Sequence, residues 1–318
     1  MVDVSIIIIN WNTKQLLQDC LESVYEQAGD ADSNGVNYEV IVVDNASTDG
    51  SKEMIKSCFP NVVLIENDKN RGFAAANNQG IAVAGGRYVL LLNSDTIVLG
   101  DCLAKITGFA DANPRAGVVG CRVLNPDRSL QPTCFMFPSV LNMLLSSTYL
   151  YKLFPGNRFF GRERMTWWDR NDVREVDVVT GCFMLVRREA IEKVGFMDER
   201  FFMYAEETDW CYRFKTSGWK VMFSPVGEII HYGGQSSRQV PVAMIVQLRL
   251  SILMFIRKHY GGLSHFIARL LVAFFFAVRL PIWLAVSFIR PGERSAASVK
   301  MQAYSTGIIG ALFGQADL

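Results

Sequence analysis

An apolar run ends in three polar residues, Asn93, Ser94 and Asp95, in the segment LLLNSD. A carboxylate at this position suits a hard divalent ion such as Mg²⁺ or Mn²⁺, which prefers oxygen ligands and is commonly shared with phosphates. Such an ion neutralises the charge that builds up on a departing phosphate group. His231, one of three histidines in the chain, lies in IIHYGG and is a candidate second ligand, although a lone histidine is more often structural.

A second acidic segment, YAEETDW (204–210), opens a predicted helix. Acidic residues in a first helical turn are favoured by the helix dipole, which is a structural explanation. The functional alternative is a general base that takes the proton from an attacking hydroxyl. Asp209 and Arg213 stand four positions apart and are expected to form an ion pair on the helix, so Glu206 and Glu207 remain as the candidate bases.

Two further segments offer contacts to a nucleotide. Asp44 follows an apolar run, and its carboxylate can accept the imide N–H of uracil or thymine; alternatively, the turn VDNASTDGS simply caps a helix. Arg71 precedes a predicted helix N-terminus, where backbone N–H groups favour anions. It can hold a diphosphate or a base, or it can be a solvated surface residue.

The elements that carry these segments alternate between strands and helices. The predicted strands are Val4–Ile9, Glu39–Val43, Val62–Ile65, Tyr88–Leu92, 118–119, Val178–Val186 and Trp219–Phe223. The predicted helices are 16–25, Ser51–Cys58, Ala74–Val83, Leu103–Ala110, Arg188–Val194 and Thr208–Thr216. Continuous apolar strands separated by helices indicate a parallel sheet covered on both faces.

Ligands of such sheets bind beyond the carboxyl ends of the strands. The polar residues lie there in this chain: Asn10 and Trp11 follow the first strand, Asp44 and Asn45 the second, and residues 93–95 the fourth. Residues 122–176 are less regular and are interpreted as long loops and short helices that border the site.

Composition narrows the class of protein. The formal net charge of +1 gives no support for a nucleic-acid partner. The seven cysteines are odd in number and form no CxxC pair, which favours buried free thiols in a reducing compartment. The N-terminal MVDVSIIII lacks a basic region and is not expected to be a signal peptide, so the catalytic part is expected to be cytosolic.

The last part of the chain has a different character. Residues 242–256 are apolar and helical, and 266–289 are almost wholly apolar apart from Arg269, Arg279 and Pro281. Charges at bilayer depth are costly, so we expect one or two helices lying in the interface, with the arginines among lipid phosphates. A core helix or a homodimer interface is the alternative. We therefore expect a domain 1–240 and a membrane-associating helical region 241–318, with the membrane surface contacted through 263–290.

Together these segments resemble family 2 glycosyltransferases of the GT-A fold, and most closely the bacterial rhamnosyltransferase branch. The segments that carry the resemblance are SIIIINWN (5–12), VVDNASTDGS (42–51), NRGFAAANNQG (70–80), YVLLLNSDT (88–96), TGCFMLVRREA (180–190), GFMDERFFMYAEETDWCYR (195–213) and HYGGQS (231–236). The resemblance covers about residues 3–260. It implies a Rossmann-like, mostly parallel sheet flanked by helices, and an inverting single displacement.

The resemblance also implies roles for individual residues. Asp44 would read the base, Arg71 would support the nucleotide, and Asp95 would hold a Mg²⁺ or Mn²⁺ ion, with His231 as an additional ligand. Glu207 falls on the position of the catalytic acid, with Glu206 beside it. The remaining residues expected in the nucleotide-sugar site are Asn10, Trp11, Asn45, Asn78, Asn93 and Ser94. Two positions depart from the family pattern: Asn93 replaces the first acid of the metal motif, and the base is Glu rather than Asp.

We therefore expect a peripheral enzyme on the cytoplasmic side of the inner membrane. Its expected reaction moves L-rhamnose from dTDP-L-rhamnose to a glycan or polyprenyl-diphosphate-linked acceptor. Transfer from a UDP-sugar, such as galactofuranose or a hexose, or from a GDP-sugar is the alternative within the fold. A sugar nucleotidyltransferase is disfavoured because Asn10, Trp11 and Asn12 stand where a Gly-rich loop is needed. A membrane-docked nucleotide-sugar binder without turnover is the non-enzyme alternative.

Overall fold

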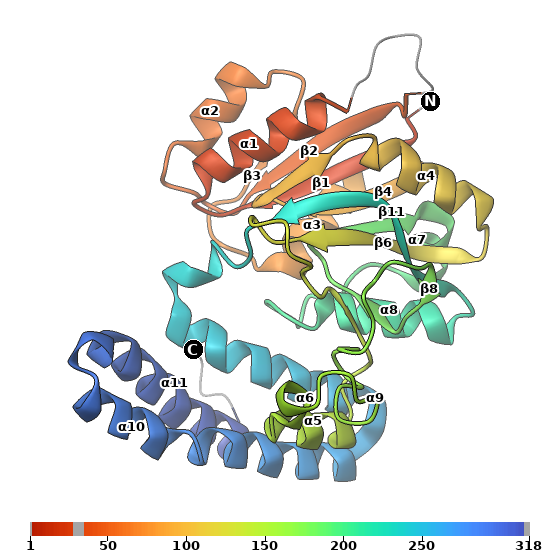
Figure 1. Cartoon of the computed structure of the whole chain (residues 1–318). Helices are drawn as coiled ribbons and strands as arrows, with labels where there is room; N and C mark the ends of the chain where they lie inside the picture. The colour runs from red at the N-terminus through yellow and green to blue at the C-terminus, as the bar shows by residue number, and fades with distance from the viewer. Residues whose placement is uncertain (1, 28–34, 315–318) are drawn as a thin grey trace. The chain divides into compact units, whose positions relative to one another are not determined.

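The computed structural model describes residues 2–27 and 35–314 (Figure 1). The chain divides into two compact units. The first comprises Met1–Phe137, Trp168–Phe202 and Glu206–Ser236. The second comprises Pro138–Trp167, Met203–Ala205 and Ser237–Leu318. The second unit therefore includes residues 138–167 in addition to the C-terminal helical region that begins after residue 240 in the sequence analysis.

A mixed sheet forms the centre of the first unit. Its strands are β1 (Val4–Asn10), β2 (Tyr38–Asp44), β3 (Val63–Glu66), β4 (Tyr88–Asn93), β5 (Thr96–Leu99), β6 (Ala116–Leu124), β8 (Arg174–Glu175), β10 (Phe183–Arg187) and β11 (Lys220–His231). The order is β3-β2-β1-β4-β10-β6-β11-β5, with β8 paired to β11. A small second sheet pairs β7 (Cys134–Phe135) with β9 (Val178–Val179). Strands β1 to β4 are parallel, as predicted.

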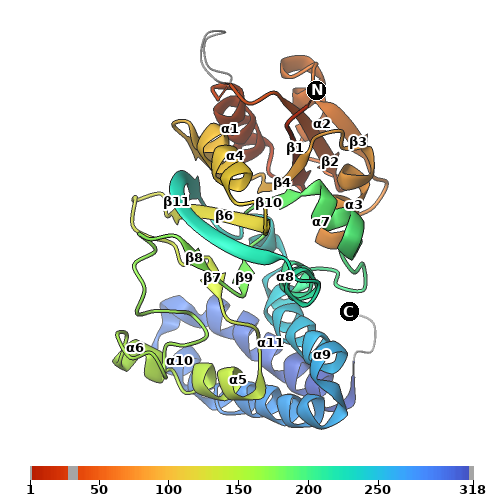
Figure 2. The ribbon, with the colours of Figure 1, turned by 90° about the vertical axis from the view of Figure 1, so that its right-hand side faces the viewer.

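Helices cover both faces of this sheet (Figures 1 and 2). They are α1 (Lys14–Tyr25), α2 (Ser51–Cys58), α3 (Phe73–Val83), α4 (Cys102–Ala112), α7 (Arg188–Val194) and α8 (Glu206–Thr216). Side chains of α1, α2 and α4 share one apolar core with alternate residues of the central strands. Helices α3, α7 and α8 lie on the opposite face. Strands buried on both faces explain the uninterrupted β-branched runs of the sequence, and the predicted α/β architecture is confirmed.

Several details of the sheet differ from the prediction, among them the short strand β8 and the greater length of β6. The predicted strand Val178–Val186 is split into β9 and β10, and β10 is antiparallel to both β4 and β6. Strand β5 was not predicted. Strand β11 does not end at Ser224–Pro225 but continues to His231, with an irregular register between Phe223 and Glu228. A proline cannot donate to a ladder and is tolerated at such an irregularity, so it does not end the strand here.

The cysteines are free thiols, as predicted. All are buried except Cys58. Burial raises the pKa of the Cys20, Cys134 and Cys182 thiols to about 12. They therefore stay protonated at neutral pH and act as small apolar core residues.

The second unit is helical. Its elements are α5 (Val140–Ser147), α6 (Leu150–Leu153), the short 3-10 helices η1 (Ser237–Gln239) and η2 (Pro291–Glu293), and the helices α9 (Pro241–Ala277), α10 (Leu280–Ile289) and α11 (Arg294–Phe313). Gly261 has φ 80° and ψ −176°, so α9 is bent into two helices at this residue. Among the described residues, the stretch Pro241–Ile289 is long and apolar enough to cross a membrane.

The two arginines of this stretch do not point to lipid as predicted. Arg279 is buried and donates to the carbonyls of Phe275 at 2.9 Å and Ser147 at 3.0 Å. Its guanidinium also lies 3.7 Å from the ring centroid of Phe275. Arg269 donates to the carbonyls of Ala311 and Leu312 near the end of α11. Last-turn carbonyls of a helix lack partners within the helix, which explains why a cation is retained there.

Candidate active site

The carboxyl ends of β1, β2 and β4 meet at one edge of the sheet. Asn10 is in register with Asp44, and Ile9 with Asn93. Hydrogen bonds join the three ends. The Asn10 amide donates to Asp44 at 2.9 Å and accepts from the Thr13 hydroxyl at 2.7 Å. The Thr13 and Ser94 hydroxyls are 2.9 Å apart. Asn10 and Ser94 are both buried, so they tie the strand ends together.

Asp44 is fully buried, and both of its carboxylate oxygens are used within the protein. One accepts from the Asn10 amide, and the other accepts from the backbone N–H of Ser47 at 2.8 Å. The Ser47 hydroxyl in turn accepts from the backbone N–H of Asn12 at 2.9 Å. Asp44 therefore shapes the turns after β1 and β2. Its contact with a base stays a prediction, one that requires the exchange of a hydrogen bond within this network.

Asn45 organises the loop that carries Arg71. Its side-chain oxygen accepts from the Asn67 amide at 2.9 Å and from the Arg71 backbone at 3.4 Å, and its amide donates to the Gly72 carbonyl at 3.2 Å. Gly72 has φ 84°, and a Cβ there would lie 2.4 Å from the Phe202 carbonyl. The Arg71 side chain is exposed and makes no hydrogen bond with the described residues, so its cation is available to an anionic ligand.

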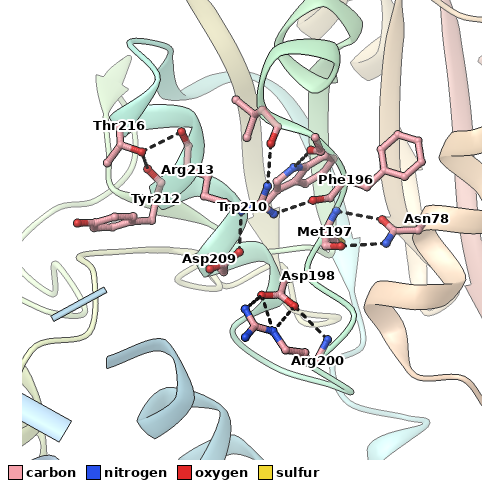
Figure 3. Close-up of polar contacts among 12 residues, drawn as sticks. Asn78, Phe196, Met197, Asp198, Arg200, Asp209, Trp210, Tyr212, Arg213 and Thr216 are labelled. Atoms are coloured by element: carbon pink, nitrogen blue, oxygen red, sulfur yellow. Dashed lines mark hydrogen bonds and ion pairs between the residues drawn. The ribbon is translucent and has the colours of Figure 1, made fainter. Parts of the chain in front are cut away.

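Asn78 holds a neighbouring loop in place (Figure 3), and its predicted contact with the nucleotide-sugar stays a prediction. It is buried, and its amide donates to the Met197 carbonyl at 3.0 Å and to the Glu199 carboxylate at 2.9 Å. Its oxygen accepts from the Met197 backbone N–H at 3.0 Å. Every polar atom of the side chain is thus engaged in holding the 197–199 loop against α3.

The same loop is fixed from the other side by α8 (Figure 3). The predicted pair of Asp209 and Arg213 is confirmed at 2.8 Å, and Asp209 is fully buried. Arg213 also donates to the Phe196 carbonyl at 2.8 Å, and the Trp210 indole donates to the Gly195 carbonyl at 2.9 Å. Asp209 is therefore structural, and the start of α8 is rigidly placed.

Asp95 and His231 meet at the same edge of the sheet. The distance from Asp95 Oδ1 to His231 Nε2 is 3.2 Å, and the two side chains are 8% and 13% exposed. The backbone N–H of Gln235 donates to Asp95 Oδ2 at 3.4 Å, and Asn93 Nδ2 lies 3.3 Å from His231 Nε2. Burial acts to raise the pKa of Asp95, but the hydrogen bond and charge of His231 outweigh it, and the pKa is lowered.

This pair fits a divalent cation. A carboxylate oxygen and an imidazole nitrogen converge on one point, and the lowered pKa of Asp95 keeps it ionised. The described part of the chain contains no group of three or more His, Cys, Asp or Glu side chains placed to hold a metal. A cation here would therefore take its remaining ligands from water and phosphates, as Mg²⁺ usually does.

Glu206 and Glu207 begin α8. Their pKa values are shifted in the opposite direction to that of Asp95. Burial, followed by the charge of Glu207, raises the pKa of Glu206 well above its usual value. Burial likewise raises the pKa of Glu207, against the smaller opposing effect of hydrogen bonds. Glu206 Oε2 has no hydrogen-bond partner among the described residues, whereas Glu207 Oε1 accepts from the Thr208 hydroxyl at 3.3 Å.

The backbone before α8 is strained. Tyr204 and Ala205 have φ of 68° and 66°, in the left-handed region that non-glycine residues rarely adopt. Phe202, just before them, accepts from the Phe73 backbone N–H at 2.7 Å and packs on Gly72 beside Arg71. Strain of this kind clusters at functional sites.

The two neighbouring carboxyl groups of Glu206 and Glu207, with their raised pKa values, suit proton transfer, because a base should titrate near the working pH.

The loop after β11 closes on the turn after β1. The Ser236 hydroxyl donates to the Trp11 carbonyl at 3.2 Å, and the backbone N–H of Tyr232 donates to the Asp95 carbonyl at 2.9 Å. Sequence reasoning missed Thr13, Gln131 and Gln235 as members of this edge. Gln131 accepts from His231 Nδ1 at 2.6 Å, but it lies in the region interpreted as irregular loops.

Comparison with known proteins identifies the class of enzyme to which this fold belongs. Residues 5–195 match the model of glycosyl transferase family 2, so the chain belongs to that family. The chain is 28% identical over 234 residues to the N-acetylglucosaminyl-diphospho-decaprenol L-rhamnosyltransferase of Mycobacterium tuberculosis (strain H37Rv), covering 70% of this chain and 76% of that protein. It is 25% identical over 234 residues to the low-salt glycan biosynthesis hexosyltransferase Agl10 of Haloferax volcanii, covering 72% and 67%.

Solved structures share the fold. The mannosyltransferase PcManGT from Pyrobaculum calidifontis, solved with GDP-Man and Mn²⁺, matches with a TM-score of 0.59 and 18% identity, over 98% of this chain and 87% of that one. GalNAc-T7, solved with UDP, GalNAc and Mn²⁺, matches with a TM-score of 0.53 and 16% identity, over 73% and 43%. The protein is therefore a glycosyltransferase with the GT-A fold.

Proposed function

We propose that this enzyme transfers L-rhamnose from dTDP-L-rhamnose to a hydroxyl of a polyprenyl-diphosphate-linked glycan, at the cytoplasmic face of the membrane. The observation that carries the transfer chemistry is the adjacent pair of the buried Glu206 and the half-buried Glu207, whose carboxyl groups have raised pKa values. The choice of sugar and acceptor rests on the similarity to the mycobacterial L-rhamnosyltransferase over 70% of the chain. The hexosyltransferase relative favours a hexose donor as the second candidate, and UDP-hexoses and UDP-galactofuranose are the donors of this class that we expect.

The reaction is a single inverting displacement. The ionised Glu207 takes the proton from the acceptor hydroxyl, and that oxygen forms the new bond to the anomeric carbon. The bond between this carbon and the donor's phosphate oxygen breaks, and its electron pair leaves with the nucleoside diphosphate. Glu206, whose pKa is raised further, keeps its proton and so avoids a second negative charge beside Glu207.

Asp95 and His231 are proposed to hold the divalent cation, Mg²⁺ or Mn²⁺, and Arg71 to bind the diphosphate or base. When bound, the cation neutralises negative charge on the departing diphosphate. Asn93 and Trp11 flank this position, at the ends of β4 and β1. Ser94, Asn10, Asn45 and Asp44 act by fixing the strand ends and loops that carry these groups.

The second unit supplies a surface suited to a membrane. Only 22% of the most apolar window of Pro241–Ile289 is buried, unlike a core helix. Phe266, Leu270 and Phe274 recur every four residues along α9 and are exposed, which places them on one helical face. Exposed apolar residues continue on α10 at Ile282, Phe288 and Ile289. Arg257, Arg290 and Arg294 are exposed beside these helices and would meet anionic lipid headgroups.

A donor scan tests the proposal. Purified full-length protein with Mn²⁺ and a synthetic prenyl-diphosphate acceptor is given dTDP-L-rhamnose, UDP-hexoses, UDP-galactofuranose and GDP-sugars, and nucleoside diphosphate release is measured. Release with dTDP-L-rhamnose that depends on the acceptor supports the proposal. Turnover only with another donor would remove rhamnose, and background rates with every donor would favour a binder without turnover.

A flotation assay tests the surface of the second unit. We expect the protein to float with vesicles that contain anionic lipid, and a Phe266→Ser, Phe274→Ser variant to stay in the soluble fraction. The matched control is Val272→Ala, a conservative change of a residue on the buried side of the same helix. If the wild type fails to float and sediments as a dimer that the double variant disrupts, the apolar face is a homodimer interface instead.

A further inference from the structure

The orientation of the Gln131 amide, which lies beside His231, can be deduced from its own hydrogen bonds. Its amide nitrogen donates to the His231 backbone carbonyl at 3.0 Å and to the Asn125 side-chain oxygen at 2.8 Å. A backbone carbonyl only accepts, so the nitrogen of the Gln131 amide must face it. The amide of Asn125 is itself fixed, because its nitrogen donates to the Ser129 hydroxyl at 2.9 Å.

The other atom of the Gln131 amide, Oε1, therefore faces the imidazole. It lies 2.6 Å from His231 Nδ1. An amide oxygen has no hydrogen to donate, so Nδ1 must carry the proton of this short hydrogen bond. In a neutral imidazole one nitrogen carries the proton and the other is a bare acceptor. Gln131 thus selects the tautomer in which Nε2 has an open lone pair.

That lone pair points to Asp95. His231 Nε2 and Asp95 Oδ1 are 3.2 Å apart, and both are acceptors in this tautomer. Two acceptors at this distance repel each other unless a positive charge lies between them, either a proton on Nε2, which makes the ring cationic, or a metal cation that replaces that proton. Asn93 Nδ2, at 3.3 Å from Nε2, is the remaining donor, and its amide has no other hydrogen bond among the described residues. The Asn93 amide is thus free to turn its oxygen toward the same point.

We propose that Gln131 is a positioning residue that holds the neutral His231 ring in its Nδ1–H tautomer, so that Nε2 binds a divalent cation together with Asp95. This inference rests on the proposed function, in which Asp95 and His231 hold the cation. Partners of the second ring nitrogen commonly orient a metal-binding histidine, and their loss weakens metal affinity about 10- to 100-fold. Here an amide on the 125–131 loop supplies that partner, although this loop contributes no ligand of its own.

A purely structural Gln131 would behave differently. Its backbone N–H donates to the Val123 carbonyl at 2.9 Å, which already holds the loop against β6. If the side chain only stabilised this loop, its removal would lower the Tm without changing the tautomer of His231 or the affinity for a metal. The protonation of the two imidazole nitrogens of His231 therefore distinguishes a positioning role of Gln131 from a purely structural one.

The test uses full-length protein labelled with ¹⁵N-histidine, without metal, at a pH where the ring is neutral. The chain has three histidines, and a His231→Asn variant identifies the signals of His231. Mn²⁺ affinity is measured on the same samples by titration calorimetry. The variants are Gln131→Leu, which removes the acceptor, and Gln131→Glu, which keeps one. Gln15→Leu makes the same change on the exposed surface of α1 and serves as the control.

We expect wild type, Gln15→Leu and Gln131→Glu to show a protonated Nδ1 and an unprotonated Nε2. Gln131→Leu is expected to show a mixture of tautomers and a 10- to 100-fold weaker Mn²⁺ affinity. Mn²⁺ affinity within twofold of wild type in Gln131→Leu, an unchanged tautomer in that variant, or equal Mn²⁺ affinity in His231→Asn would overturn the inference. Transfer is assayed separately: a wild type that binds Mn²⁺ through His231 but transfers no sugar contradicts the proposed function alone.

Discussion

Two acidic side chains of the first unit, Asp95 and Glu206, are similarly buried, yet their pKa values are shifted in opposite directions. Asp95 is 6% exposed and Glu206 is 4% exposed. The pKa of Asp95 is lowered because His231 and the Gln235 backbone outweigh its burial, whereas the pKa of Glu206 is raised because burial and Glu207 act together. Burial alone therefore does not decide the protonation state, and the partner does. The contrast fits the roles that we propose: the ionised Asp95 would bind a cation, and the glutamate pair would accept the proton of an alcohol.

The sharpest way to break this contrast is to remove the proposed base. Glu207→Gln keeps the shape of the side chain but cannot take a proton. We expect kcat to fall about 10²- to 10⁴-fold while donor affinity changes little. Steady-state transfer and donor titration measure the two effects. Transfer at the wild-type rate would show that another group is the base.

Removing the fixed anion should give the complementary result. In Asp95→Asn the side chain can no longer supply a carboxylate to the cation, and we expect Mn²⁺-dependent donor affinity to weaken on the order of 100-fold. Calorimetry with and without Mn²⁺ measures this change. The matched control is Asp209→Asn, which alters a buried carboxylate that pairs with Arg213 on α8 and lies outside the proposed cation site. An unchanged affinity in Asp95→Asn would remove Asp95 from the cation site.

The raised pKa of Glu207 predicts the pH profile of transfer. The base works only when ionised, so kcat should fall about tenfold for each pH unit below the pKa of Glu207. Because burial raises this pKa, the acid limb should lie above the ordinary glutamate value of 4.5. Donor binding, which we propose to depend on the already ionised Asp95, should persist through this range. A limb at or below 4.5 would contradict the raised pKa of Glu207.

Glu206 gives the smallest effect, on stability rather than rate. Its pKa is higher in the folded than in the unfolded protein, so the folded state binds more protons between these two values, and wild-type stability falls as pH rises through this window. Glu206→Gln removes this loss. We expect the free energy of unfolding of the variant, relative to that of wild type, to rise from pH 5 to pH 8 by about 1.4 kcal/mol for each unit of pKa shift. Denaturant unfolding at each pH measures this difference, and a constant difference would mean that Glu206 is not desolvated.

Much of this arrangement could be predicted from local patterns. The runs IIII (6–9) and YVLLL (88–92) are apolar, and each is followed by an asparagine, so short segments of sequence predict both the parallel strands and the polar edge where they end. The pair Asp209 and Arg213 follows from helical spacing alone. The periodicity of apolar residues and the polar residues at strand ends are therefore enough to predict these parts of the fold.

The sequence does not predict where a side chain points when its hydrogen-bond partner is distant in the chain. Asn78 and Asn45 are polar residues near a predicted ligand, but their amides are used by Met197 and by the Arg71 loop. Gln131 acts across a hundred residues on His231, and no spacing signals such a contact. Arg269 and Arg279 stand among apolar residues, where lipid phosphates and helix carbonyls are equally plausible partners until the helices are packed.

The most direct measurement of the divided roles is donor titration with Mn²⁺ on Glu207→Gln and Asp95→Asn, alongside the single-turnover transfer rate of each. Glu207→Gln should bind the donor as wild type does and fail to transfer the sugar, whereas Asp95→Asn should lose the Mn²⁺-dependent binding itself. Donor affinity lost in Glu207→Gln, or both binding and transfer retained in Asp95→Asn, would contradict the assignment of one carboxylate to the cation and the other to the proton.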